Sequence, residues 1–325
     1  MIKMIIDCDT GIDDSLALLF ALNRPDVRVM AVTTVFGNVD ADQAADNSLR
    51  LIRLAQVDYR VPVAIGARHP LQGTWAGAPS HIHGKNGIGD VLLPASNQEV
   101  EEQEACDLIN DLARENPGEI TIVSLGRMTN LARALEKEPA LPHLIRKVVA
   151  MGGTLNHCGN TGPMSEANIQ GDPEAADRVM MAGFALTMVG LDVTMKTRLT
   201  HDDLDCLVRY CKPEKRAIVD YIIDALEHYF TFNRVQDGAL NDCPLHDPTA
   251  MIVALDPSVA IMQMRRARVE CQGHLTRGMI VTDQRFRPAN LPLSNFCLEV
   301  DSRRVVATLL SAFMLDDWFP DSSDL

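Results

Sequence analysis

The chain has 325 residues, and its 44 acidic residues exceed its 30 Lys and Arg residues, which gives a formal net charge of −14. An acidic surface repels polyanions, so the charge argues against a protein that binds nucleic acid or an anionic membrane. Apolar residues make up 46 % of the chain and charged residues only 23 %, which excludes a disordered protein and allows a sizeable core.

The N-terminus and the cysteines indicate the compartment. No apolar run is long enough to span a membrane, and Asp7 interrupts the first apolar segment before a signal peptide could form. The eight cysteines are scattered without C-x-x-C pairs, unlike the dense spacing of disulfide-rich secreted domains. We therefore expect a cytoplasmic protein with reduced thiols.

The first part of the chain alternates between strand and helix patterns. Short runs rich in Ile and Val predict buried strands at Ile2–Ile6, Val27–Val32, Val61–Ile65, Ile120–Val123, Val148–Met151 and Ala185–Val189. The intervening segments predict helices at Asp13–Leu22, Ala41–Ala55, Glu99–Glu115, Asn130–Lys137 and Pro173–Met181. This alternation predicts an α/β fold with an open, doubly wound, mainly parallel sheet flanked by helices.

The sequence after residue 198 is more helical. Helices are predicted at His201–Arg209, Glu214–Phe230, Pro248–Ala254 and Arg303–Leu315, and strands at Val259–Ile261, Ala267–Glu270 and Met279–Val281. Neither an internal repeat nor a break in composition divides the chain. We therefore expect a single domain that spans residues 1–325.

An unusual group of acidic residues follows the first predicted strand. Asp7 and Asp9 share one face of that strand, and Gly11 permits a turn that brings Asp13 and Asp14 back towards them. Four carboxylates at such spacing repel one another unless a cation neutralises them. Oxygen ligands favour Ca²⁺ or Mg²⁺ over zinc, so the turn predicts a metal or catalytic site.

Two other interpretations of this turn stay open. Asp13 or Asp14 can simply cap the N-terminus of the first helix, where a carboxylate also suits the helix dipole. The spacing of Asp7 and Asp9 also matches the aspartyl-nucleophile turn of an Mg²⁺-dependent phosphatase, with Asp7 as nucleophile and Asp9 as acid and base.

Polar groups also follow the other predicted strands, where an open parallel sheet binds its ligands. Asn38 follows the second strand, although a turn role explains it better when it is considered alone. The last carbonyls of the fourth strand are free at the same crevice, so a backbone oxygen there is a candidate metal ligand. The long loop after the fifth strand contains Asn160, Glu166 and Asn168, which suit sugar hydroxyls. A solvated surface loop is the alternative.

Two later segments carry further candidates. Asp247 stands in the N-cap place of the helix that begins at Pro248, so capping alone also accounts for it. His246 beside it can donate a proton near neutral pH. The glycine-rich segment 81–89, which contains His83, predicts a mobile flap.

These candidates stand in blocks that resemble the inosine-uridine-preferring nucleoside hydrolase family. The D-x-D-x-G-x-D-D pattern of residues 7–14 resembles the defining motif of that family. Further blocks follow in family order at Val35–Asn38, His83–Gly87, Met151–Gly153, Gly159–Asn160, Glu166–Asn168, Asp172–Ala176 and Leu245–Pro248. Together they cover nearly the whole chain.

The resemblance implies a calcium-dependent enzyme that hydrolyses the N-glycosidic bond of purine or pyrimidine ribonucleosides to free base and ribose. The implied calcium ligands are Asp9, Asp14, Asp247 and the Leu125 carbonyl. The implied ribose-binding residues are Asp13, Asn38, Asn160, Glu166 and Asn168, with Asp7 supporting the metal turn. The resemblance also implies a homodimer or homotetramer.

The implied mechanism is an inverting attack by a calcium-bound water, with Asp9 as general base. His246 and His83 are the candidates for protonating the departing base. Ala167 stands where many relatives carry an aromatic residue, which leaves the preference for purines or pyrimidines open. A third interpretation is a non-catalytic protein that binds nucleosides or sugars on the same scaffold.

Overall fold

The computed structural model describes residues 1–237 and 242–315. The strands are β1 (Ile2–Cys8), β2 (Val27–Thr34), β3 (Val63–Ile65), β4 (Ile120–Ser124), β5 (Lys147–Met151), β6 (Leu186–Val189), β7 (Arg198–Thr200), β8 (Asp242–Pro244), β9 (Ala260–Val269), β10 (Ile280–Thr282) and β11 (Leu293–Val300). The larger helices are α1 (Ile12–Leu22), α2 (Ala41–Ala55), α4 (Ala105–Glu115), α5 (Thr129–Lys137), α8 (Pro173–Met181), α10 (His201–Arg209), α11 (Arg216–Asp237), α12 (His246–Leu255) and α13 (Ser302–Ser311). Short helical turns are α3 (Ser80–His83), α6 (Leu141–Leu144), α7 (Ala167–Gly171) and α9 (Leu191–Thr194).

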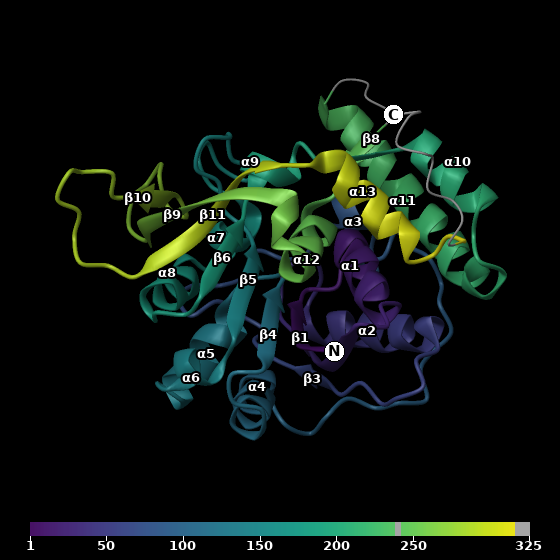
Figure 1. Cartoon of the computed structure of the whole chain (residues 1–325), viewed down its shortest axis with the longest axis horizontal. Helices are drawn as coiled ribbons and strands as arrows, with labels where there is room; N and C mark the ends of the chain where they lie inside the picture. Colours follow the sequence, from purple (N-terminus) through teal and green to yellow (C-terminus); the bar gives the residue numbers. More distant parts are fainter. Residues whose placement is uncertain (238–241, 316–325) are drawn as a thin grey trace.

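Nine of the strands in the described residues form one sheet, in the order β10-β9-β11-β6-β5-β4-β1-β2-β3 (Figure 1). The strands from β3 to β11 in this order run parallel, and β9 and β10 join antiparallel at one edge. Strands β7 and β8 form a separate antiparallel pair. The expected doubly wound, mainly parallel α/β fold is confirmed.

Helices cover both faces of the sheet because successive side chains of a strand point to opposite sides. In β1, Met4 and Ile6 belong to the core that includes α1, α2 and α12. The residue between them, Ile5, belongs to a second core with α4, α5 and α8. A strand buried on both sides has no polar alternation, which is why its sequence is continuously apolar.

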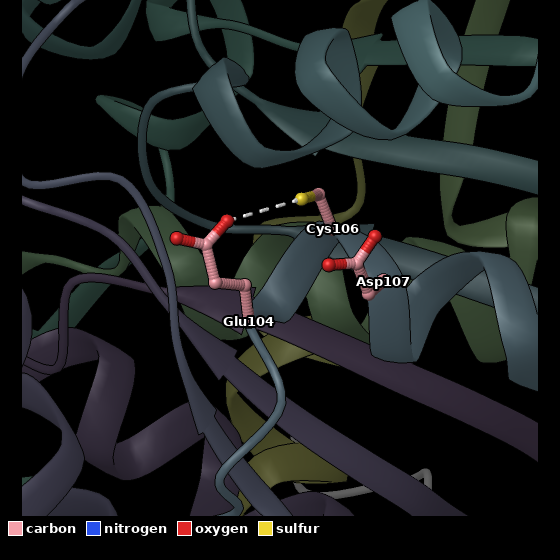
Figure 2. A group of neighbouring side chains, drawn as sticks. All are labelled: Glu104, Cys106 and Asp107. Carbon is pink, nitrogen blue, oxygen red and sulfur yellow. Dashed lines mark hydrogen bonds between the residues drawn. The ribbon is translucent and has the colours of Figure 1, made fainter.

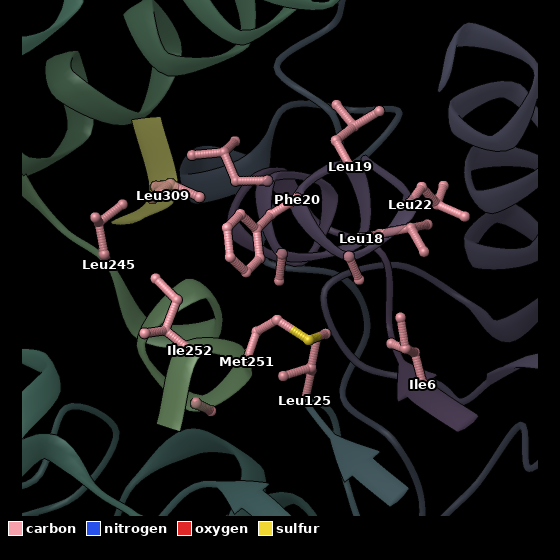
Figure 3. Packing of buried hydrophobic residues seen from close by; sticks show 14 of the residues in the cluster. Ile6, Leu18, Leu19, Phe20, Leu22, Leu125, Leu245, Met251, Ile252 and Leu309 are labelled. Atoms are coloured by element: carbon pink, nitrogen blue, oxygen red, sulfur yellow. The ribbon is translucent and has the colours of Figure 1, made fainter. Parts of the chain in front are cut away.

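Helices α1 and α12 pack against each other in the first core. Both are apolar almost all round, so they must be buried on every side. Leu18 and Phe20 of α1 are fully buried, as are Met251 and Ile252 of α12. Figure 3 shows these side chains converging, with Leu125 from the end of β4 beside them. This packing fixes where the two helices begin relative to the sheet.

The order of the strands creates a crevice at the carboxyl end of β1. The chain passes from β1 to β2 and β3 on one side, and later returns to β4 on the other side. Asp7 pairs in register with Thr33 of β2 and with Ser124 of β4. Residues directly beyond these strands therefore meet at the topological switch point, the usual ligand site of such sheets.

The predicted strands of the C-terminal part need correction. The pieces predicted at Val259–Ile261 and Ala267–Glu270 belong to one continuous strand, β9, whose middle is largely exposed and arginine-rich. Strand β11 has no counterpart in the prediction, because Ser294 and Asn295 interrupt its apolar pattern. It pairs with both β6 and β9 and joins the antiparallel edge to the parallel sheet.

The helix predicted at Glu99–Glu115 begins only at Ala105. The preceding acidic residues have good helix propensity, but the Glu101 N–H donates to the Val63 carbonyl at 2.8 Å and holds that segment against β3. Tertiary contact overrides local propensity here.

Two findings bear on the expectations about membranes and thiols. Among the described residues, no helix is both long enough and apolar enough to cross a membrane. All eight cysteines are free thiols.

Removing a buried side chain between α1 and α12 should destabilise the protein. We expect Leu18→Ala to lower the free energy of unfolding by about 2–5 kcal/mol, because it leaves a cavity in a fully buried site. The matched change Leu92→Ala, at a position that is 93 % exposed, should alter it by less than about 0.5 kcal/mol. Urea denaturation followed by circular dichroism measures both. Equal effects of the two substitutions would contradict this packing.

Candidate active site

Three buried carboxylates from distant parts of the chain converge at the switch point. Asp13 and Asp14 lie in the first turn of α1, and Asp247 lies in the first turn of α12. Each offers an oxygen that lies within 4.8 Å of those of the other two. Both helices present their N-termini here, where backbone N–H groups favour negative charge. We call these three residues together with Asp9 the acidic cluster.

Asn38 ties Asp9 to Asp14. Its backbone N–H donates to Asp9 Oδ2 at 2.7 Å, and its side-chain amide donates to Asp14 Oδ2 at 3.0 Å. Asp14 Oδ2 also accepts the Gly11 N–H at 2.8 Å, which caps α1. The capping interpretation is therefore correct for one oxygen of Asp14, but it leaves the other oxygen free for a second role.

Several carboxylate oxygens in this region have no hydrogen-bond partner. Within the described residues, Oδ1 of Asp9, Asp13 and Asp14 are all buried and unpaired. A buried carboxylate oxygen without a donor carries a large desolvation cost. Such a set of hard oxygen donors, with no nitrogen or sulfur among them, fits a divalent cation such as Ca²⁺ or Mg²⁺.

The pKa values of these carboxyl groups show the same unfavourable burial of negative charge. Burial raises the pKa of Asp13 to about 7, and repulsion from Asp9 adds to the effect. Burial, followed by repulsion within the acidic cluster, raises the pKa of Asp14 and that of Asp247 well above the usual range. Without a cation, the acidic cluster must take up protons to stay buried.

Asp7 lies behind the acidic cluster and is fully buried. Its Oδ1 accepts hydrogen bonds from Thr33 Oγ1 and from Asn130 Nδ2, each at 2.7 Å. Burial raises its pKa to about 7. These contacts join β1, β2 and α5 beneath the turn.

Arg127 belongs to the site, although no sequence pattern predicted a role for it. Its Nη1 donates to Asp9 Oδ2 in a buried ion pair. Burial raises the pKa of Asp9, and the positive charge of Arg127 opposes that rise. The feature that could have indicated this role is the position of Arg127 itself, a basic residue two positions beyond Leu125 at the carboxyl end of a predicted strand.

The predicted sugar-binding residues divide into two groups. The Asn168 side chain is buried and donates to the Leu125 carbonyl at 2.6 Å, which places it at the end of β4. Glu166 is also buried, but its carboxylate caps α7 and accepts N–H groups from Gly153, Asn168 and Ile169. Asn160 is exposed, and its Oδ1 accepts the Ala167 N–H at 3.0 Å. Within the described residues, no hydrogen bond joins it to the acidic cluster.

The two candidate histidines lie at the starts of the two helices that contribute to the acidic cluster, His83 against α1 and His246 as the first residue of α12. His83, at the end of α3, accepts the Ile12 N–H at Nδ1 and stacks on Tyr229 with ring centres 6.0 Å apart. His246 pairs through Nδ1 with Thr194 Oγ1 at 2.8 Å. Burial lowers the pKa of His83 to about 3 and that of His246 to about 4, so both rings are neutral at physiological pH.

The local prediction for Asp247 needs correction. Helix α12 begins at His246 with Leu245 at its N-cap, so Asp247 is the second helical residue and does not cap the helix. The Asp247 carboxylate lies close to those of Asp13 and Asp14 at the start of α1, rather than bonding the N–H groups of its own helix.

A second group of possible metal ligands lies outside the crevice, where Figure 2 shows Glu104, Cys106 and Asp107. Lys137 Nζ donates to both oxygens of Asp107, at 2.8 and 2.9 Å. Glu104 is exposed, and its Oε2 accepts the Cys106 thiol at 3.8 Å. A lysine thus donates to one carboxylate of this group, as an arginine does in the acidic cluster, but here the other carboxylate, Glu104, is exposed to solvent.

Comparisons with known proteins agree with this geometry. The family model described as inosine-uridine preferring nucleoside hydrolase matches residues 4–307. Uridine nucleosidase 1 of Arabidopsis thaliana is 38 % identical over 83 % of this chain and 79 % of its own length. The pyrimidine-specific ribonucleoside hydrolase of Salmonella schwarzengrund is 34 % identical over 95 % of this chain and 97 % of its own.

Solved structures give the same result. A purine-preferring ribonucleoside hydrolase from Gardnerella vaginalis superposes with a TM-score of 0.89 at 33 % identity, covering 95 % of this chain and 97 % of the other. A plant nucleoside hydrolase superposes with a TM-score of 0.89 at 34 % identity, covering 95 % and 98 %. The chain therefore belongs to the inosine-uridine preferring nucleoside hydrolase family and is a ribonucleoside hydrolase, an enzyme that cleaves N-glycosidic bonds.

Proposed function

We propose that the acidic cluster holds Ca²⁺ and that the chain uses it to hydrolyse ribonucleosides to free base and ribose with inversion at the anomeric carbon. The observation that carries this proposal is the set of buried, unpaired oxygens on Asp9, Asp13 and Asp14, next to Asp247. A protein gains nothing in stability from packing such groups together without a cation.

The proposed metal ligands are Asp9, Asp14, Asp247 and the carbonyl of Leu125. The first three would supply negative charge, and the carbonyl directly follows β4, where it already accepts the Asn168 amide. When bound, calcium would neutralise the carboxylates and lower the pKa of a water in its coordination shell.

Asp9 is the proposed general base. Its Oδ2 accepts two hydrogen bonds, from Asn38 and Arg127, whereas its buried Oδ1 accepts none. Oδ1 is therefore the atom that can take the proton of the attacking water. Attack on the face of the sugar opposite the base inverts the anomeric carbon.

The proposed ribose site combines Asp13, Asn38, Asn160, Glu166 and Asn168. Carboxylate and amide oxygens can hold sugar hydroxyls and stabilise the positive charge that the ribose develops as the base leaves. Asn168 is buried and hydrogen-bonded to the Leu125 carbonyl at the end of β4, which supports this role. Glu166 is buried on the same loop, and its carboxylate would have to hold a sugar hydroxyl in addition to the N–H groups that it accepts. Asn160 lies on the exposed part of the same loop and would have to approach the sugar from there.

The departing base would be protonated by His246 or His83. Both imidazoles are neutral, so the available donor is a ring N–H rather than an imidazolium. In His83, Nδ1 accepts the Ile12 N–H, which leaves the proton on Nε2. Uridine and inosine are the first substrates to test, because the names of relatives and of the family include both.

The pathway, the compartment and the oligomeric state of the enzyme are also proposals. We place the enzyme in nucleoside salvage in the cytoplasm, as a homodimer or homotetramer. Exposed apolar side chains at Ile261 and Met264 in β9, and at Phe286 in the connection between β10 and β11, suit contacts between subunits. Figure 1 shows the antiparallel edge of the sheet extending away from the rest of the molecule. A single domain for residues 1–325 stays a prediction.

The alternatives receive less support. For a phosphatase that uses Asp7 as nucleophile, Oδ1 of Asp7 is already held by Thr33 and Asn130, and Asp7 is not one of the three carboxylates that converge at the switch point. A non-catalytic nucleoside-binding protein would bind substrates without releasing base.

Replacing the proposed base should abolish turnover. Asp9→Asn keeps the shape of the side chain but removes its ability to accept a proton, so we expect kcat for uridine or inosine to fall by about 10²–10⁴-fold. Release of free base, followed by chromatography, measures the change. Asp111→Asn, which alters a half-exposed carboxylate, is the control and should keep the parent rate. Turnover by Asp9→Asn within a few-fold of the parent would show that this mechanism is wrong.

Removing the metal should stop the reaction, and the metal should bind at the acidic cluster. Chelator treatment should abolish ribonucleoside cleavage, and added Ca²⁺ should restore it. A nucleoside that lacks the 2′-hydroxyl should be cleaved poorly even with Ca²⁺ present, because it loses a contact to the site. Product chromatography over a panel of ribonucleosides and 2′-deoxyribonucleosides measures both effects.

The control for metal placement is the double variant Glu104→Gln with Asp107→Asn. It removes the other candidate ligands and should keep one Ca²⁺ per chain by calorimetry, whereas Asp14→Asn with Asp247→Asn should lose the ion. The reverse pattern would contradict the proposed site.

The metal-free protein should lose stability as the pH rises. The folded-state pKa values of Asp7 and Asp13, about 7, exceed the usual unfolded value of about 3.9. Their protonated forms therefore stabilise the fold below pH 4 or so, and this contribution is lost as the pH rises through about 7. Saturating Ca²⁺ should weaken or reverse the trend, since it replaces the protons. Thermal denaturation between pH 5 and pH 8, with and without Ca²⁺, measures the slopes; equal slopes would contradict this prediction.

A further inference from the structure

Arg127 reaches Asp9 from an unusual position. It stands two residues beyond Leu125, just before α5, and its side chain is only 11 % exposed. Its guanidinium carbon lies 5.7 Å from the centre of the Phe36 ring, and its Nη1 donates to Asp9 Oδ2. A long cationic side chain thus lies along an aromatic face and ends at the proposed base.

Two glycines make room for this side chain. A Cβ atom at Gly37 would lie 1.7 Å from Arg127 Nη1 and 1.8 Å from Asp9 Oδ2. A Cβ atom at Gly171 would lie 2.5 Å from Arg127 Nε. Any larger residue at either position would displace the guanidinium. Because Gly37 and Gly171 have no side chains, the Arg127 side chain fits between them, and the backbone on either side leaves it little room to move.

We propose that Arg127 is a positioning residue that orients the Asp9 carboxylate for its role as general base. Together with the Asn38 N–H it occupies Oδ2, so that Oδ1 alone is left for the water. Without the guanidinium, one backbone N–H would hold the carboxylate, which could then rotate away from its acidic neighbours. This inference rests on the proposed function of Asp9.

The contact is poorly suited to a purely structural role. Burying an arginine and a carboxylate costs desolvation energy that their attraction repays only when the remaining donors are satisfied. Arg127 Nε is buried and has no partner in the described residues. The arginine therefore gives up part of its hydrogen bonding while it holds Asp9, as expected when orientation of a reacting group is its function.

The test compares Arg127→Ala, Arg127→Lys and Gly171→Ala. We expect Arg127→Ala to lower kcat by about 10²-fold, because a displacement of about 1 Å can cost that much, while KM stays near the parent value and the protein stays folded at the assay temperature. Arg127→Lys should recover only part of the loss, because a shorter point charge replaces the planar fork. Added guanidinium at low millimolar concentration should partly rescue Arg127→Ala.

Gly171→Ala reaches the same arginine without changing its charge. It should lower kcat in the parent background but have little further effect in the Arg127→Ala background, since no guanidinium is left to displace. Calorimetry should show one Ca²⁺ per chain in every variant, with affinity reduced far less than kcat. Val39→Ala is the packing control, because it shortens a buried side chain in the turn that contains Gly37, where the Val39 carbonyl accepts the Gly37 N–H.

Parent-like kcat in Arg127→Ala would overturn this inference, and so would a loss of kcat in Arg127→Ala that tracks a loss of the folded state or of Ca²⁺ binding. Additive effects of Arg127→Ala and Gly171→Ala would overturn it as well. The proposed function is tested separately by the parent enzyme and Asp9→Asn. If the parent cleaves no ribonucleoside, the proposed function fails before the Arg127 variants are compared.

Discussion

Repulsion among buried carboxylates is the constraint on which the rest of the structure depends. Asp9, Asp13, Asp14 and Asp247 are all nearly inaccessible to solvent, and three of them carry an oxygen with no partner in the described residues. Water cannot screen these charges, so they require either protons or a cation. Every other feature of the crevice either brings these groups together or compensates for their proximity.

The fold brings these carboxylates together through the apolar packing of α1 against α12. Helices α1 and α12 are held by Leu18, Phe20 and Met251 in a dry core, and their N-termini consequently face the same point beyond β1. The energy that concentrates negative charge therefore comes from burying hydrocarbon several residues away. Arg127 and Asn38 then compensate locally by holding one oxygen of Asp9.

Much of this could be predicted from the sequence, because strand periodicity and the order of apolar runs determine which side chains leave the sheet together. The turn from Asp7 to Asp14 follows from those rules alone. The convergence of Asp247 was indicated only by resemblance to a family, because no local pattern relates it to residues more than 200 positions earlier. The ion pair of Arg127 was not predictable either, since its partner Asp9 lies 118 positions away in the sequence. Strand β11 was missed because Ser294 and Asn295 interrupt its apolar pattern. It forms a strand because it pairs with both β6 and β9, which are not its neighbours in the sequence.

The most direct test is a crystal structure with Ca²⁺ and ribose, with the ion located by anomalous scattering. We predict one ion bound by oxygens of Asp9, Asp14 and Asp247 and by the Leu125 carbonyl at about 2.3–2.6 Å, with the sugar hydroxyls completing its coordination. An acidic cluster that stays free of metal at saturating Ca²⁺, or an ion found only beside Glu104 and Asp107, would contradict the central claim.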